Sequence, residues 1–132
     1  MLVDTGAWYA LIDRKDPDHE RVRVCLDEHL GRMITTDYVV DETITLLRYR
    51  AGWKAARAFG KSLLDNEPHI SALVTLKQEE RQEAWKIFCR YRDKSFSFTD
   101  CTSFALMRKL KLDTAIAIDR DFRSFGLHCI PH

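Results

Sequence analysis

The sequence has few residues of the kinds that break a chain into separate units. It contains five glycines and three prolines in 132 residues, with no Gly/Ser-rich or Pro-rich linker and no internal repeat. No apolar run approaches the ~20 residues needed to cross a bilayer. No basic segment followed by an apolar stretch marks a signal peptide. We therefore expect one domain over residues 1–132, located in the cytoplasm and without a membrane partner.

Cysteine is also scarce and widely spaced. Cys25, Cys89, Cys101 and Cys129 form no C-x-x-C pair. This spacing supports neither a zinc site nor a thioredoxin-type motif. For a cytoplasmic chain we expect free thiols, most of them buried.

An excess of charge of one sign is missing as well. The 21 basic and 20 acidic residues leave a net charge of +1. A protein that coats duplex DNA without sequence preference is usually more basic. An enzyme that holds a short stretch of RNA needs only a local positive rim, so the charge leaves RNA open as a partner.

Short apolar segments alternate with longer amphipathic ones along the whole chain. This alternation predicts an α/β domain whose mainly parallel sheet is flanked by helices. The expected strands are 2–3, 33–35, 69–73, 114–118 and 128–130, and the expected helices are 8–12, 19–30, 37–50, 53–64, 77–91, 99–110 and 121–125. Thr36 or Asp37 is expected to cap the third helix and Thr99 the sixth.

Four acidic residues occupy unusual places in this pattern. Asp4 and Asp119 each follow an apolar strand segment. Ligands of parallel sheets bind outside the carboxyl ends of the strands, so both acids are expected at that edge. At 100° per residue, Asp100 shares a helix side with apolar residues, and Glu42 lies at the border of an apolar stripe. A carboxylate beside a buried face needs a partner.

Four converging carboxylates repel one another. At about 5 Å and an effective dielectric near 20, each pair costs roughly 3 kcal/mol. Either the acids lie apart, or some are protonated, or a divalent cation neutralises them. Carboxylate oxygens without His or Cys suit Mg²⁺ or Mn²⁺, which activate water and stabilise a phosphate in transfer. Taken singly, each acid is more often a helix cap or a surface charge.

Four segments carry a resemblance to a known family. Residues 2–11, 37–43, 97–107 and 117–126 each contain one of the four acids. In this order and spacing they resemble the four motifs of the PIN-domain family, and more narrowly of VapC-type toxin ribonucleases. The resemblance covers essentially the whole chain.

The resemblance implies a PIN-like three-layer sandwich that cleaves single-stranded RNA with Mg²⁺ or Mn²⁺. It makes Asp4 and Asp100 the direct metal ligands, while Glu42 and Asp119 complete the acidic site. Asp121 is a weaker candidate, either as a cap or as a holder of a second metal. The resemblance also implies a small antitoxin as partner, and a homodimer. Apolar surface near Trp53 and Trp85 suits such contacts, although core packing explains both tryptophans equally well.

Three alternatives compete with a nuclease. A haloacid-dehalogenase-like phosphatase needs a second Asp two residues after the first, where this chain has Gly6. A receiver domain usually carries an acidic pair near its first strand and a Lys after its last, and neither is in place. The third alternative is a PIN-like module that binds RNA or protein without cleaving it.

Overall fold

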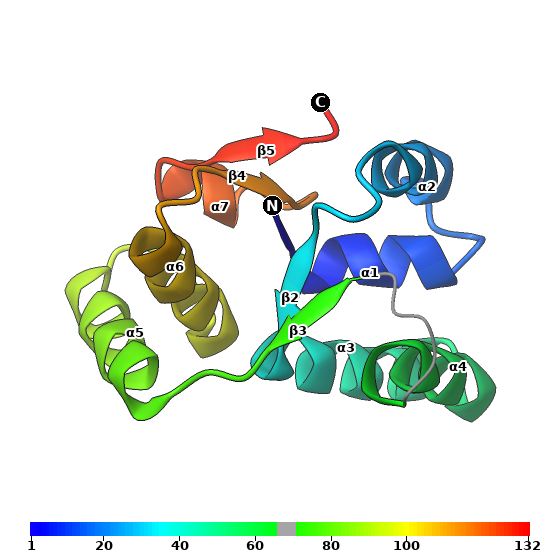
Figure 1. Ribbon diagram of the computed structural model, residues 1–132, viewed down its shortest axis with the longest axis horizontal. Coiled ribbons are helices and arrows are strands. Elements are labelled where there is room, and N and C mark those ends of the chain that lie inside the picture. The colour runs from blue at the N-terminus through cyan, green and yellow to red at the C-terminus, as the bar shows by residue number, and fades with distance from the viewer. Residues whose placement is uncertain (66–70) are drawn as a thin grey trace.

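The computed structural model describes residues 1–65 and 71–132 of the chain. Strands and helices alternate along these residues (Figure 1). The strands are β1 (Leu2–Val3), β2 (Ile34–Thr36), β3 (Ala72–Val74), β4 (Thr114–Ile116) and β5 (His128–Ile130). The helices are α1 (Thr5–Ile12), α2 (His19–Glu28), α3 (Asp37–Arg50), α4 (Trp53–Leu64), α5 (Gln78–Arg90), α6 (Phe98–Leu110) and α7 (Asp121–Ser124).

The five strands of the described residues form one sheet in the order β3-β2-β1-β4-β5. Every pairing in it is parallel, which confirms the α/β prediction. The chain passes from β1 outward to β2 and β3, then returns to the other side of β1 to form β4. The direction of travel therefore reverses between β1 and β4. In open parallel sheets this switch point is where ligands bind.

The sheet is the middle one of three layers, as expected. Alternate side chains of a strand point to opposite faces, so Leu2 and Val3 belong to two different cores. Helices α1 to α4 contribute to the core that contains Val3, while α5 to α7 contribute to the core that contains Leu2. Figure 1 shows α5 and α6 on one side of the sheet and α1 to α4 on the other. Burial on both faces explains why Leu2 and Val3 of β1, and Ala115 and Ile116 of β4, are all apolar.

Several predicted boundaries shift in the structure. The strand expected at 114–118 ends at Ile116, so Asp119 stands three residues beyond it. The strand expected at 69–73 is β3 and runs from Ala72 to Val74. The start of the strand expected at 69–73 lies outside the described residues. The strand ends move because pairing with a neighbouring strand, which local sequence does not encode, decides where a strand ends.

The structure shows which residues cap α3 and α6. Thr36 caps α3, since its hydroxyl accepts a hydrogen bond of 3.0 Å from the amide of Val39. The cap predicted for α6 at Thr99 is wrong, because α6 begins at Phe98 and Ser97 is its N-cap. Ser97 is the cap because it lies three residues before Asp100, and the two residues exchange a reciprocal pair of hydrogen bonds.

Two expectations from the sequence concern membrane-spanning helices and free cysteines. No helix within residues 1–65 or 71–132 has the length and apolar character needed to cross a membrane. All four cysteines are free, and only Cys89 of the four is exposed, which agrees with the prediction of mostly buried thiols.

Candidate functional site

Asp4 and Asp119 lie on either side of the switch point between β1 and β4. Asp4 directly follows β1, and its backbone amide donates a hydrogen bond of 3.0 Å to the carbonyl of Ile116 at the end of β4. Asp119 follows β4 after a short bend. The predicted placement of both acids near the carboxyl edge of the sheet agrees with this topology.

The carboxylate of Asp4 is buried without serving as a helix cap. Asp4 occupies the N-cap position of α1, yet its side chain makes no capping hydrogen bond, and the residue is 3% exposed. Burial first, and then the charge of Asp100, raise the pKa of Asp4 well above its usual range. The charges of Asp119 and Glu42 act in the same direction. A buried carboxyl with this environment is typical of a functional site.

Asp100 is held at the start of α6 by a reciprocal pair of hydrogen bonds. Its amide donates to the Ser97 hydroxyl, and its Oδ2 accepts from the Ser97 amide, both at 3.0 Å. The residue is 8% exposed. Burial, opposed by the Ser97 amide and reinforced by Asp119, Asp121 and Glu42, raises the pKa of Asp100 to about 7. The capping box therefore fixes the orientation of a carboxyl that is poised to change charge near neutral pH.

The predicted inward side of α6 is confirmed. Phe104 and Met107, which share that side with Asp100, are fully buried. Glu42 lies in the second turn of α3 and is half-buried, whereas its neighbour Asp41 is exposed. Its charge acts on both Asp4 and Asp100, so it belongs to the same electrostatic group.

The two acids after β4 are more exposed than Asp4 and Asp100. Asp119 is exposed, and its Oδ1 accepts a hydrogen bond of 3.0 Å from the amide of Asp121. Although the residue is exposed, partial burial of its carboxyl group raises the pKa of Asp119, and the charge of Asp121 adds to this. Asp121 opens α7, a four-residue helix, and its charge also acts on Asp100. Asp121 thus stands at the margin of the group.

The side chains of the four acids are of the type that binds a hard divalent cation. The four acids offer only carboxylate oxygens, and the buried Thr5 hydroxyl beside Asp4 has no hydrogen-bond partner among the described residues. An unpaired buried hydroxyl costs about 1–3 kcal/mol, so a water or ion next to it is favoured. Within the described residues, no three acidic, His or Cys side chains already stand close enough to hold a metal ion.

The part that Ser97 plays was not predicted. The cap was expected at Thr99, whose carbonyl instead accepts a hydrogen bond of 2.6 Å from the Thr102 hydroxyl. The Ser-x-x-Asp spacing of residues 97–100 was the available signal, because it matches a capping box with Asp in place of Glu.

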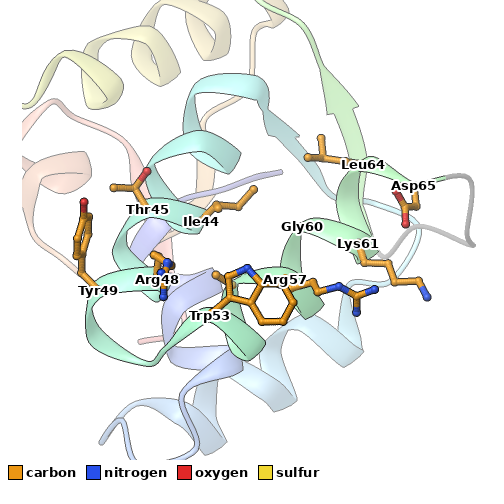
Figure 2. Close-up of a pocket in the computed structure, with 11 residues that line it drawn as sticks. Ile44, Thr45, Arg48, Tyr49, Trp53, Arg57, Gly60, Lys61, Leu64 and Asp65 are labelled. Carbon is orange, nitrogen blue, oxygen red and sulfur yellow. The ribbon is translucent and has the colours of Figure 1, made fainter.

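A second surface feature is the groove between α3 and α4 (Figure 2), which has a volume of about 550 Å³. Gly60 lets the two helices approach, since a Cβ at this position would meet the Ile44 side chain at 3.3 Å. Trp53 is 58% exposed, and the Cζ of Arg57 lies over its ring, 5.8 Å from the ring centre. Core packing therefore does not explain Trp53. The groove is also lined by Arg48, Tyr49, Lys61 and Leu64.

Comparison with known proteins identifies the family. Residues 1–126 match the model of the PIN domain. The chain is 35% identical over 126 residues to the 23S rRNA-specific endonuclease VapC20 of Mycobacterium tuberculosis, a match that covers 96% of this chain and 94% of the relative. It is 28% identical over 120 residues to ribonuclease VapC26 of the same organism, covering 91% and 87%.

Solved structures agree with the sequence matches. The crystal structure of Mycobacterium tuberculosis VapC20, described as a sarcin-ricin loop cleaving toxin, superposes with a TM-score of 0.89 at 31% identity and covers 96% of this chain and 95% of that one. FitAcB from Neisseria gonorrhoeae, at 16% identity and a TM-score of 0.73, covers 98% and 96% and shares the fold. Because the family model matches residues 1–126 and the identity to VapC20 extends over nearly the whole chain, the chain belongs to the PIN-domain family, among the VapC-type proteins.

Proposed function

We propose that this protein is a metal-dependent endoribonuclease that cleaves single-stranded regions of RNA, as the toxin of a type II toxin–antitoxin pair. The observation that carries the proposal is the electrostatic coupling of four carboxyls at the switch point, two of them almost fully buried. Burying repelling acids destabilises a fold unless they bind something in return. The ribonuclease names of the relatives support the same conclusion.

Each acid has a role in this proposal. Asp4 and Asp100 would hold Mg²⁺ or Mn²⁺, while Glu42 and Asp119 complete the negative site directly or through water. When bound, such an ion polarises the scissile phosphate and lowers the pKa of a water. The capping box keeps Asp100 in place, and the Thr5 hydroxyl is available to orient a water beside Asp4. In this mechanism no histidine acts as the base.

The substrate proposal starts from the relative VapC20. VapC20 is named as a 23S rRNA-specific endonuclease, and its crystal structure is described as that of a sarcin-ricin loop cleaving toxin. We therefore propose a loop of large-subunit ribosomal RNA as the first substrate to try. Such a loop presents unstacked nucleotides, which proteins bind more readily than paired ones.

The test is cleavage by Asp100→Asn, whose amide retains the oxygen that accepts from the Ser97 amide. RNA ends are sequenced after incubation of ribosomal RNA with each purified protein and Mg²⁺. The parent should produce defined new ends, and Asp100→Asn should lose at least about 100-fold in rate. Asp93→Asn, at an exposed turn, is the matched control and should cleave like the parent. Equal cleavage by Asp100→Asn would contradict the proposal.

The α3/α4 groove is our proposed docking face for the antitoxin. Its apolar floor and the cations of Arg48, Arg57 and Lys61 suit an amphipathic helix with acidic flanks. Co-expression of the cognate antitoxin should relieve growth arrest caused by this chain. Trp53→Ala with Arg57→Ala should reduce that relief while leaving RNA cleavage intact. Leu110→Ala, which removes an exposed side chain from α6, should change neither.

The remaining expectations stay proposals. We propose that residues 1–132 act as one domain in the cytoplasm, where the RNA substrate lies, and that the chain forms a homodimer. Light scattering after size-exclusion chromatography tests the last point, since a monomer at micromolar concentration would contradict it. The alternative of a non-catalytic RNA- or protein-binding module would be supported if metal and RNA bound but no new RNA ends appeared.

A further inference from the structure

Two aromatic rings lie exposed on the outer face of α5. Trp85 and Phe88 stack on each other with ring centres 5.7 Å apart and an interplanar angle of 15°. Trp85 is 58% exposed and Phe88 is 41% exposed, so packing in the core does not explain either ring. We call this pair the α5 aromatic face. Figure 1 shows α5 as the outer helix beside α6.

A third ring joins this face to the acidic site. Phe98 meets Trp85 and Phe88 edge-on, with ring centres 6.4 Å and 6.3 Å away. Phe98 opens α6, whose first turn carries Asp100. On its other side Phe98 contacts Tyr38, which lies one helical turn before Glu42 on α3. Aromatic rings therefore run continuously from the neighbourhood of the acids to the open face of α5.

Charge is segregated around α5. Its acidic residues face α6, where Lys109 contacts Glu79 and Glu80 and where Arg108 lies 3.5 Å from Glu83. Beside Trp85, a shallow pocket of about 440 Å³ is lined by Arg81 and Lys86, with Gln78 and Gln82. Neither of these cations forms an ion pair within residues 1–65 and 71–132. The aromatic face is consequently bordered by two cations without an ion pair in the described part of the chain, of which Arg81 also donates a hydrogen bond of 3.0 Å to the Leu76 carbonyl.

An acidic site that cleaves RNA requires that other residues of the protein bind the RNA strand. Its carboxylates repel the RNA backbone, and the chain as a whole has a net charge of only +1. Base stacking on aromatic side chains supplies about 1–3 kcal/mol per base and tolerates any sequence. Flanking Arg and Lys side chains bind the phosphates between the bases. The α5 aromatic face combines both elements next to Phe98, which opens the helix that carries Asp100.

We propose that the α5 aromatic face is a stacking subsite for unpaired bases of the RNA strand that is cleaved at the acidic site. This inference rests on the proposed ribonuclease function and adds where the strand is held. One base stacks on the exposed side of Trp85, while Arg81 and Lys86 contact the neighbouring phosphates. The subsite recognises flat, unstacked bases and therefore favours single strands over duplexes.

Binding without cleavage is measured on the full-length Asp100→Asn protein. The probe is a short, dye-labelled single-stranded RNA, followed by fluorescence anisotropy. Adding Trp85→Ala should weaken binding about ten-fold, and Trp85→Phe should restore part of the loss. Trp53→Ala is the matched control because Trp53 is also 58% exposed, and it should leave RNA affinity unchanged. On an abasic strand of the same length, Trp85→Ala should have no effect.

Three results would overturn the inference. They are unchanged RNA affinity in Trp85→Ala, an equal loss of affinity on the abasic strand, and conversion of a parent dimer to a monomer by Trp85→Ala. The last result would make the face a contact between copies of this chain. Cleavage assays separate these outcomes from the proposed function. If parent protein and Trp85→Ala cleave RNA alike while Asp100→Asn does not, the stacking subsite fails and the nuclease stands.

Discussion

The amide of Asp4 is hydrogen-bonded to the carbonyl of Ile116, 3.0 Å away, so the end of β1 is fixed to the end of β4. These two strands are neighbours in the sheet although more than a hundred residues separate them in the chain. The bond joins Asp4, the first of the four acids, to β4, the strand that precedes Asp119. It holds Asp4 and the turn of Asp119 at a common edge.

Stability of the metal-free protein should depend on the ionisation of Asp100. Burial raises its pKa from 3.8 to about 7, so the folded protein retains a proton that the unfolded chain has released. Between about pH 4 and pH 7 the free energy of unfolding therefore falls as pH rises. Asp100→Asn removes this pH dependence. The free energy of unfolding of the variant, relative to that of the parent, should therefore increase by up to about 4 kcal/mol as pH rises across that window.

Urea unfolding at a series of pH values, in the presence of a chelator, measures this difference. Asp93→Asn serves as the control, because this exposed Asp should leave the pH dependence of the parent unaltered. Parallel curves for the parent and Asp100→Asn would show that Asp100 ionises normally in the folded protein.

Addition of Mg²⁺ or Mn²⁺ should stabilise the fold. A ligand that binds only the folded state at a hundred times its Kd contributes about 2.7 kcal/mol. The melting temperature should accordingly rise by several degrees at millimolar metal. Asp4→Asn combined with Asp100→Asn should abolish the shift, since both buried carboxyls are removed. A shift of the same size with sodium at matched ionic strength would count against a specific site.

Glu42 and Asp41 offer a test within one helical turn. Glu42 is half-buried and acts electrostatically on Asp4, whereas Asp41 is exposed. Glu42→Gln should lower the cleavage rate about 100-fold or more, and Asp41→Asn should leave it nearly unchanged. Initial rates on the same RNA decide the matter. Comparable losses in both variants would mean that overall charge, and not position, controls the rate.

The capping box predicts a joint effect on stability and activity. Ser97→Ala removes the hydroxyl that accepts from the Asp100 amide, at a cost of about 1 kcal/mol. The start of α6 should loosen, and cleavage should fall while remaining measurable. Ser97→Thr should restore both properties. Thr99→Ala should cost less stability than Ser97→Ala, and the opposite order by chemical denaturation would reinstate Thr99 as the cap.

Local sequence was enough to predict several parts of the site. The angle between positions on a helix indicated that Asp100 faces inward with Phe104, and both are buried. The short apolar segment before Asp4 placed that acid at a strand end. These predictions succeed because helix and strand periodicity depends on neighbours within a few residues.

Only the tertiary structure decided which segments meet. Periodicity shows that a face is buried but not what covers it, so the sheet order, and with it the switch point beside Asp4, depended on long-range packing. The same limit left the exposure of Trp53 and Trp85 open, because an aromatic ring packs equally well in a core or at a surface site. It also left the distance of Asp119 from its strand undecided, since pairing with β1 and β5 determines where β4 ends. The sequence by itself determined the four acids and their local settings, and the parallel sheet brought them into one electrostatic group.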